Sequence, residues 1–274
     1  MAGMDSHHHY VEVQEDMETS SPEEAIICNS LITRMYIREA VAEMIGTFLI
    51  VFAGGASSIL SGFGTISTSI CGAMAVSLMI FATGHISRAH LNPAVTLGFA
   101  MAGVCSWKQV VPYIIGQILG SLFASVSLLV IVHDATLFSA AINQPSQDGG
   151  ASFVFEFVAT FFLMFMNMKV ACNIGKVGVL GGAFMVGITV ALLGIYAGPL
   201  CGGLSMNPAR SIGPAVVGLK FESLYIFILG PVGGAILSGV TYASKSPNDQ
   251  DKVRTHDGGF KDLRAHMANS FMGK

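Results

Sequence analysis

Two short stretches of the sequence decide the fold, Ser205-Met206-Asn207-Pro208-Ala209-Arg210 and His90-Leu91-Asn92-Pro93-Ala94-Val95. Each sets Asn-Pro-Ala at the head of an apolar stretch, at about 92–103 and 207–218. Asn favours the cap of a helix, and Pro favours its first turn because it lacks the N–H that would be unpaired there. Neither stretch reaches the roughly 20 residues that a membrane-crossing helix needs. Both are therefore expected to be re-entrant helices whose exposed ends line a cavity.

Six longer apolar stretches surround these two motifs. They lie at about 37–59, 67–86, 109–132, 152–171, 177–197 and 223–243. Of all residues 52% are hydrophobic and only 11% are charged, whereas soluble domains average about 25% charged residues. The net charge of −3 gives no reason to expect nucleic acid as a partner. We therefore expect an all-α membrane protein with six transmembrane helices and two re-entrant half-helices.

The chain repeats itself in its two halves. The stretch 42–52, Ala-Glu-Met-Ile-Gly-Thr-Phe-Leu-Ile-Val-Phe, resembles 155–165, so Glu43 and Glu156 are equivalent. Asn92 follows Glu43 by 49 residues, and Asn207 follows Glu156 by 51. Each half, at about 36–132 and 150–243, then holds three spans and one half-helix, and the odd number of spans inverts the second half. Inverted repeats with broken helices place their site at the bilayer midplane.

Two polar tails flank this channel domain, which is expected at 36–243. Residues 1–35 are polar and acidic, which is typical of a disordered tail. Residues 244–274 form a second tail that is rich in Lys and Arg. Apart from Lys220, the loops expected on the opposite side, near 60–66 and 133–150, contain no Lys or Arg. Both termini are therefore predicted to be cytoplasmic.

These motifs resemble the major intrinsic protein (aquaporin) family, and the likeness runs from about residue 40 to 243. The stretches that carry it are 42–48, 84–87, 89–96 and 205–211. Gly198-Pro199 together with 205–215 looks most like the plant nodulin-like intrinsic proteins. The resemblance implies a homotetramer in the lipid bilayer with one pore per subunit, which passes water and small uncharged solutes. It favours the plasma membrane, with an endomembrane as the alternative.

The family likeness also indicates how the pore excludes ions. Two helix N-termini face each other, and each carries about +0.5 elementary charge, which repels cations and hydrated protons. The side-chain amides of Asn92 and Asn207 can donate hydrogen bonds to a passing oxygen. Arg210 matches the family's constriction arginine, and a charged residue within an apolar stretch is a functional candidate in its own right.

Three further residues are expected to support the pore loops. Glu43 and Glu156 look structural in the family, where they accept hydrogen bonds from loop backbone, and a carboxylate inside a membrane needs such partners. His90 precedes the first motif and is expected to hold its loop by hydrogen bonding, with pH sensing as the alternative.

The family's selectivity filter has four positions, which counting from the motifs places at Gly72, Ile195, Leu204 and Arg210. Gly72 widens the pore, whereas Ile195 and Leu204 refill part of it without offering hydrogen bonds. The set lacks the aromatic and histidine residues of water-selective members, and the small residues that metalloid-conducting nodulin-like members have at the second and third positions. It favours glycerol-like polyols or neutral metalloid hydroxides over water.

One alternative function stays open at this point. Arg88 stands where the family usually has glycine, and its side chain could narrow the inner vestibule. With Ile195 and Leu204, it makes conceivable a structural or junctional membrane protein of the same fold with a weakly conducting or closed pore. We do not expect an enzyme or a secondary transporter, because no catalytic pair or coupling-ion acid stands at a recognisable spacing. We expect no cofactor and no metal site either, since the five cysteines include no CxxC pair.

Overall fold

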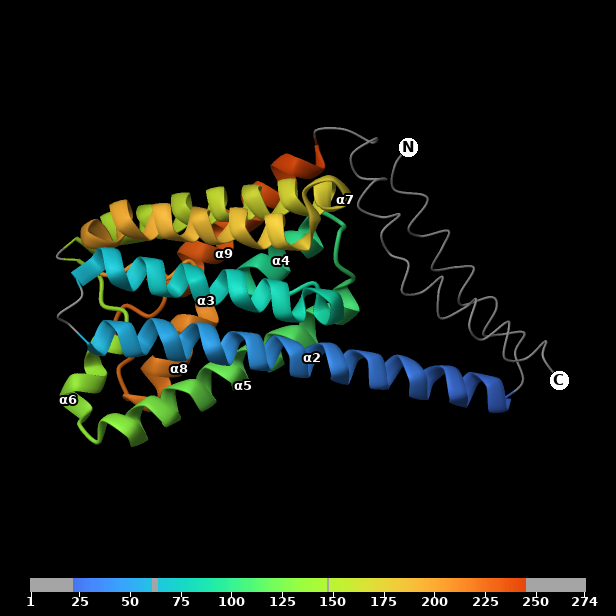
Figure 1. Cartoon of the computed structure of the whole chain (residues 1–274), viewed down its shortest axis with the longest axis horizontal. Coiled ribbons are helices and arrows are strands. Elements are labelled where there is room, and N and C mark those ends of the chain that lie inside the picture. Colours follow the sequence, from blue (N-terminus) through green and yellow to red (C-terminus); the bar gives the residue numbers. More distant parts are fainter. Residues whose placement is uncertain (1–21, 61–63, 147, 245–274) are drawn as a thin grey trace.

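The protein is a bundle of long helices that enclose two short ones (Figure 1). The structure is a computed structural model that describes residues 22–60, 64–146 and 148–244. All regular elements in these ranges are helical. They are α2 (Pro22–Ile59), α3 (Gly64–Ser87), α4 (Pro93–Met101), α5 (Trp107–Val132), α6 (Ala135–Phe138), the 3-10 turn η2 (Ser139–Ala141), α7 (Gly149–Cys201), α8 (Pro208–Val217) and α9 (Ile226–Ala243).

The predicted six membrane crossings are confirmed, although they occupy five helices. Five described helices are long and apolar enough to cross a membrane, and α7 is one of them with 53 residues. Non-helical backbone at Asn173 and at Gly178, whose φ is 69°, interrupts α7. The Ser152 hydroxyl near the start of α7 donates to the Cys201 carbonyl at its end, at 3.1 Å. The helix therefore folds back on itself and crosses twice.

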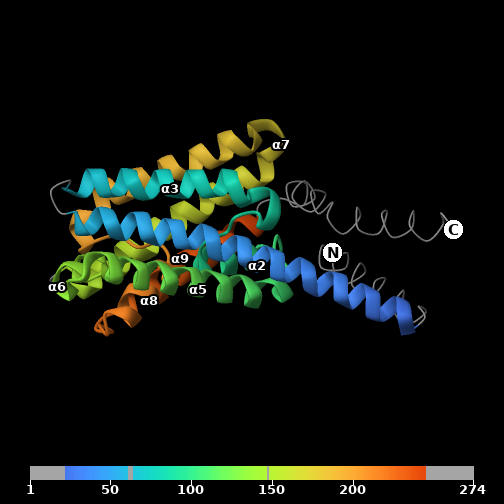
Figure 2. The same ribbon diagram turned by 60° about the horizontal axis from the view of Figure 1, so that its bottom comes forward.

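The two repeats interlock through their half-helices. In both ribbon views, α3 lies between α2 and α7 (Figures 1 and 2). The half-helix α4 packs mainly against α9, and α8 packs mainly against α5, so each half-helix lies against the last span of the other repeat. A Cβ added at Gly239 would collide with the Gly98 carbonyl, and one at Gly213 would lie 2.6 Å from the Ser121 carbonyl oxygen. Glycine is needed at these contacts because the backbones touch.

The first helix starts earlier than the sequence led us to expect. Residues 22–35, which we predicted as part of a disordered tail, are helical, because α2 begins at Pro22. Proline in the first turn and the two acids after it favour a helix start. At 1.5 Å per residue, α2 is about 57 Å long, and Figure 1 shows its first turns beyond the end of the bundle. Residues 1–21 and 245–274, which make up the rest of the two predicted tails, lie outside the described residues.

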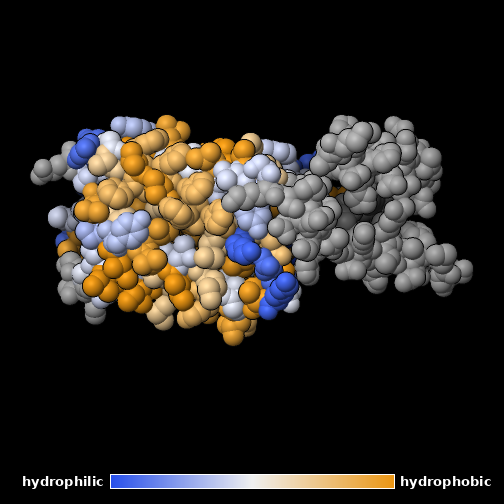
Figure 3. Space-filling view, turned by 90° about the horizontal axis from the view of Figure 1, so that it is seen from above, coloured by the Kyte–Doolittle hydropathy of each residue, from blue (hydrophilic) through white to orange (hydrophobic). Residues whose placement is uncertain are grey.

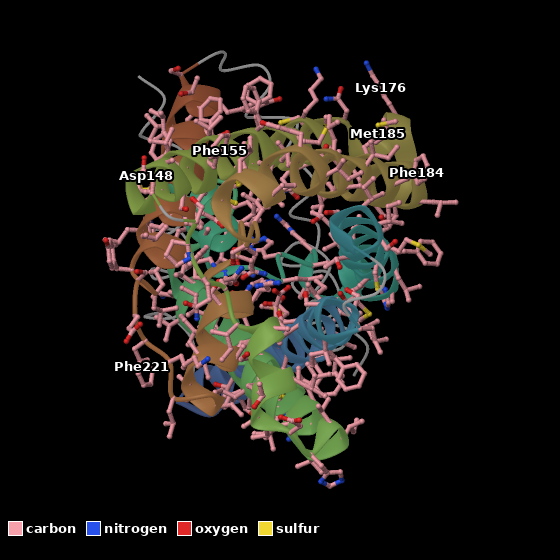
Figure 4. All side chains as sticks on the ribbon, turned by 90° about the vertical axis from the view of Figure 1, so that its left-hand side faces the viewer. Asp148, Phe155, Lys176, Phe184, Met185 and Phe221 are labelled. Atoms are coloured by element: carbon pink, nitrogen blue, oxygen red, sulfur yellow. The ribbon has the colours of Figure 1, made fainter. Side chains whose placement is uncertain are left out.

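The outside of the bundle is apolar. In Figure 3 hydrophobic side chains cover most of the visible described face, and strongly hydrophilic ones gather near its two ends. Met74, Leu180 and Leu192 are 67%, 68% and 63% exposed. Seen end-on, nitrogen and oxygen atoms lie near the middle of the bundle, whereas the labelled Phe184 and Phe221 lie outside (Figure 4). Such an arrangement suits lipid outside and a polar path within.

Candidate functional site

Each half-helix begins at one of the two Asn-Pro-Ala motifs, as predicted from the sequence. The Asn92 side-chain oxygen accepts the Ala94 N–H at 2.9 Å, and that of Asn207 accepts the Ala209 N–H at 3.0 Å. The prolines Pro93 and Pro208 are the first residues of α4 and α8. Each asparagine thus satisfies a backbone N–H that would otherwise be orphaned at a helix start.

The two asparagines are also tied across the pseudo-symmetry axis. The Asn92 amide nitrogen donates to the Met206 carbonyl at 2.7 Å, and the Asn207 amide nitrogen donates to the Leu91 carbonyl at 2.9 Å. Leu91 and Met206 have φ of 54° and 55°, a left-handed conformation that is rare for such side chains. An amide nitrogen carries two hydrogens. One hydrogen of each asparagine therefore holds the motifs together, and one is left for the cavity.

Glu43 anchors the loop that leads into α4. Its carboxylate accepts the His90 N–H at 2.9 Å and the Leu91 N–H at 2.5 Å. The Ser87 hydroxyl and the Gln117 amide donate to it as well, at 2.6 and 2.7 Å. Four donors satisfy the two oxygens of this fully buried side chain. This geometry supports the structural role that we expected for Glu43.

Glu156 performs the equivalent task in the second repeat with fewer partners. Its two oxygens accept the Ser205 N–H at 2.6 Å and the Met206 N–H at 2.8 Å. Met206 is thereby held at both ends, because its carbonyl accepts the Asn92 amide. The carboxylate of Glu156 therefore positions the carbonyl to which the other motif binds.

His90 is a buried ring that faces the same interior. Its Nδ1 lies 3.2 Å from the Thr96 hydroxyl, and its ring packs against Phe99 and Tyr113 with centroids 4.7 and 5.0 Å away. The Thr96 hydroxyl in turn donates to the Asn92 carbonyl at 3.0 Å. The ring thus links the loop to the first turn of α4, in line with the support role we expected.

A cavity of about 500 Å³ runs along these groups from the end of the bundle that carries α6, which we call the α6 end. Asn92, Asn207, His90 and Arg210 line it, so the cavity brings together both motifs, the arginine and the histidine. Its wall near the α6 end is rich in hydroxyls. These belong to Ser57, Ser58, Thr65, Thr68 and Ser69.

Three of the four predicted filter positions line this cavity, and the fourth does not. Gly72, Leu204 and Arg210 are lining residues. Among the described residues of the wall, the position expected for Ile195 is occupied by its neighbour Gly194. Counting back from Asn207 therefore missed the wall by one residue. The intervening loop contains two consecutive glycines of positive φ, Gly202 at 76° and Gly203 at 106°, so a distance counted along it is unreliable.

The correction from Ile195 to Gly194 changes the chemistry of the wall. A Cβ added at Gly194 would lie 2.7 Å from the Ser69 hydroxyl oxygen, so this hydroxyl occupies the space that a side chain at 194 would need. A Cβ added at Gly72 would meet nothing within 4 Å. Within the described residues, the Ser69 hydroxyl makes no hydrogen bond to the protein. It is therefore available to a solute, and Ile195, which was expected to refill part of the pore, is not among the described lining residues.

Arg210 lies in the first turn of α8 and is held by a residue that sequence reasoning missed. Its Nη1 donates to the side-chain oxygen of Asn143, which follows η2. Asn143 is only 7% exposed and lines the same cavity. Nothing in the sequence distinguished it, because it is one polar residue in a polar loop.

Arg88 is outside the described lining of the cavity. Its side chain is exposed, donates to the Val104 carbonyl at 3.4 Å and is not among the described residues that line the cavity. Its φ of 63° is in the region that favours glycine, which agrees with the glycine usual at this loop position. Its neighbour Ala89 lines the cavity, so the loop contributes to the wall next to Arg88.

Comparison with known proteins agrees with this geometry. The family model described as "Major intrinsic protein" matches residues 30–242. "Aquaporin NIP1-4" of Oryza sativa subsp. japonica is 38% identical over 224 residues, which cover 80% of this chain and 81% of that protein. "Nodulin-26" of Glycine max is 38% identical over 220 residues, which cover 78% and 80%. The solved aquaglyceroporin from Plasmodium falciparum shares the fold with a TM-score of 0.70 at 22% identity, covering 79% of this chain and 99% of that one.

Proposed function

We propose that this chain, which belongs to the major intrinsic protein family and is a channel for water and small uncharged solutes, admits solutes as wide as a small polyol or a neutral metalloid hydroxide. The observation that carries the proposal is the pair of glycines in the cavity wall, Gly72 and Gly194. Gly72 leaves open space, and Gly194 leaves room for the Ser69 hydroxyl.

Hydrogen-bonding groups in the wall support a polar solute. A solute that sheds water needs replacement partners, because each unpaired polar group costs about 1–3 kcal/mol. Arg210 has five N–H donors, and one of them, on Nη1, donates to Asn143. Ser69 and the second hydrogens of the motif asparagines add further donors along the path. Leu204 supplies an apolar face, so a solute with both C–H and O–H groups suits the wall.

Ion exclusion follows from the same elements. The N-termini of α4 and α8 meet where Asn92 and Asn207 cross, and helix N-termini disfavour cations. Arg210 adds a full positive charge to the wall. In pores of this type an arginine and the positive ends of half-helices form the barrier to cations and protons.

The alternative of a closed structural pore loses two of its three supports. Of the residues that suggested it, only Leu204 is among the described residues that line this cavity, whereas Arg88 and Ile195 are not. We therefore propose a conducting pore, and we expect Arg88→Gly to leave the solute flux within about twofold of wild type.

We further propose that both termini are cytoplasmic and that the protein is a homotetramer of the plasma membrane. The distribution of Lys and Arg supports this orientation. With it, the α6 end faces away from the cytoplasm. Family membership supports the tetramer, and the exposed apolar surface of the bundle is suited to lipid and to neighbouring subunits alike.

The test is solute uptake by proteoliposomes, followed by light scattering with glycerol, urea, boric acid and sucrose gradients. We expect fast uptake of at least one of the three permeant solutes. Gly72→Trp should reduce it to the rate of empty liposomes, because the indole enters open cavity. Met74→Trp is the matched control, since it puts the same side chain on the exposed face of α3. Wild-type rates no faster than those of empty liposomes would refute the proposed function.

A further inference from the structure

Asn143 makes hydrogen bonds to two parts of the pore wall. Its side-chain oxygen accepts from Arg210 Nη1 and from the Ser211 hydroxyl, the latter at 2.9 Å. Its side-chain nitrogen donates to the Gly203 carbonyl at 2.9 Å. One amide thus binds the first turn of α8 on one side and the glycine loop before it on the other.

The loop that carries Asn143 is itself fixed. The Ser146 N–H donates to the Cys201 carbonyl at 3.2 Å and lies 3.1 Å from the Ser152 hydroxyl. A Cβ added at Gly202 would collide with the Gln144 carbonyl. Asn143 is therefore a rigid support, which a residue on a loose loop could not be.

The first repeat shows what is special about this support. There the Gln117 amide nitrogen donates to the Thr96 hydroxyl at 3.0 Å, whereas in the second repeat the Asn143 amide oxygen accepts from the Ser211 hydroxyl. Thr96 and Ser211 are equivalent, since each stands four residues after its motif asparagine. The equivalent of Arg210 in the first repeat is Val95, which has no charge to hold. The amide in the second repeat has the added task of binding the guanidinium.

An arginine side chain without such a partner can occupy several rotamers. In the described structure the guanidinium donates to Asn143, and Arg210 lines the cavity. The position of the positive charge, and with it the electrostatic barrier, depends on where that side chain is held.

We propose that Asn143 is a positioning residue that holds the Arg210 guanidinium in the pore wall, so that the exclusion of protons and cations depends on this amide. The proposal rests on the proposed channel function. It predicts that loss of the amide lets charge leak while neutral solutes still pass.

The experiment measures proton influx with an entrapped pH-sensitive dye and solute uptake by light scattering, in proteoliposomes of the full chain. Asn143→Ala should raise proton influx about tenfold, as a barrier lower by about 1.4 kcal/mol would give. The uptake of the permeant solute should stay within about threefold of wild type. Gln144→Ala is the control, because that side chain is exposed in the same loop, and it should behave as wild type.

A second background separates positioning from a general structural role. If Asn143 acts through Arg210, adding Asn143→Ala to Arg210→Ala should change proton influx less than about twofold, because coupled residues are not additive. An equal rise in both backgrounds, or no rise in Asn143→Ala, would overturn the proposal. Asn143→Asp keeps the acceptor oxygen but cancels the guanidinium charge, so it should also leak, and it serves if the alanine variant does not fold. A wild type that passes no solute would instead refute the channel function.

Discussion

Replacing Glu156 by glutamine tests how the second motif is held. Both carboxylate oxygens accept backbone N–H groups, from Ser205 at 2.6 Å and from Met206 at 2.8 Å. Glutamine has one acceptor oxygen and one NH₂ group, so in either orientation one N–H donor would face another. The side chain is fully buried, so bulk water does not reach the donor that would be left unpaired.

The magnitude follows from counting these two bonds. One buried N–H left unsatisfied costs about 1–3 kcal/mol, and the remaining bond loses its charge assistance, which is worth about 1 kcal/mol more. Met206 keeps its left-handed backbone between Glu156 and the Asn92 amide, so loosening one bond also loosens the carbonyl that Asn92 needs. We expect Glu156→Gln to lower the free energy of unfolding by about 2–4 kcal/mol and to slow solute uptake.

The free energy of unfolding is measured by titrating the protein in detergent with denaturant and monitoring circular dichroism. Solute uptake is measured by light scattering of proteoliposomes. Thr160→Val is the control, because its hydroxyl donates to the Glu156 carbonyl one turn away, at 2.7 Å, and leaves the carboxylate untouched. That variant should cost less than about 1 kcal/mol. A Glu156→Gln protein as stable as the control would show that the carboxylate does not hold this loop.

Two further predictions concern the filter and the α6 end. Gly194→Val should reduce the uptake of the permeant solute at least about tenfold, because its Cβ displaces the Ser69 hydroxyl from the wall. Ile195→Ala should leave uptake unchanged within about twofold. A large effect of Ile195→Ala with little effect of Gly194→Val would favour Ile195 as the filter residue. At the exposed N-cap of α6, hydrogen bonds from the Leu137 and Thr136 N–H groups hold the pKa of Asp134 below its ordinary 3.8. A lowered pKa means that the stabilisation by the cap is fully present above pH 3.8 and is lost as the pH falls through the pKa of the folded protein. The difference in melting temperature between wild type and Asp134→Ala should therefore shrink over that pH range. A difference that grows in acid would contradict this sign.

Much of the architecture was predictable because it depends on local sequence. Length and hydropathy predict spans, and Asn-Pro predicts a capped half-helix start, whichever neighbours surround it. The equivalence of Glu43 and Glu156 could be read from the repeat alone. The early start of α2 is harder to predict, because residues 22–35 combine the acidic composition of a disordered tail with Pro22 and two acids that favour a helix start.

The wall of the cavity was less predictable because it depends on direction as well as position. One residue along a helix turns the side chain by about 100°, so an error of one residue exchanges the lining Gly194 for Ile195. The hydroxyl of Ser69 and the amide of Asn143 reach the wall from other elements, and neither has a motif that announces it.

Local features of the chain are enough to predict the two inverted repeats, the six crossings and the pair of capped half-helices, since caps, hydropathy and length act within a few turns of chain. Which atoms face the solute depends on tertiary contacts: the bonds from Asn92 to the Met206 carbonyl and from Asn207 to the Leu91 carbonyl, the Ser69 hydroxyl beside Gly194, and the bond between Arg210 and Asn143. These contacts join residues 67 to 125 positions apart. Their geometry is set by how whole helices pack, which no local pattern in the chain encodes.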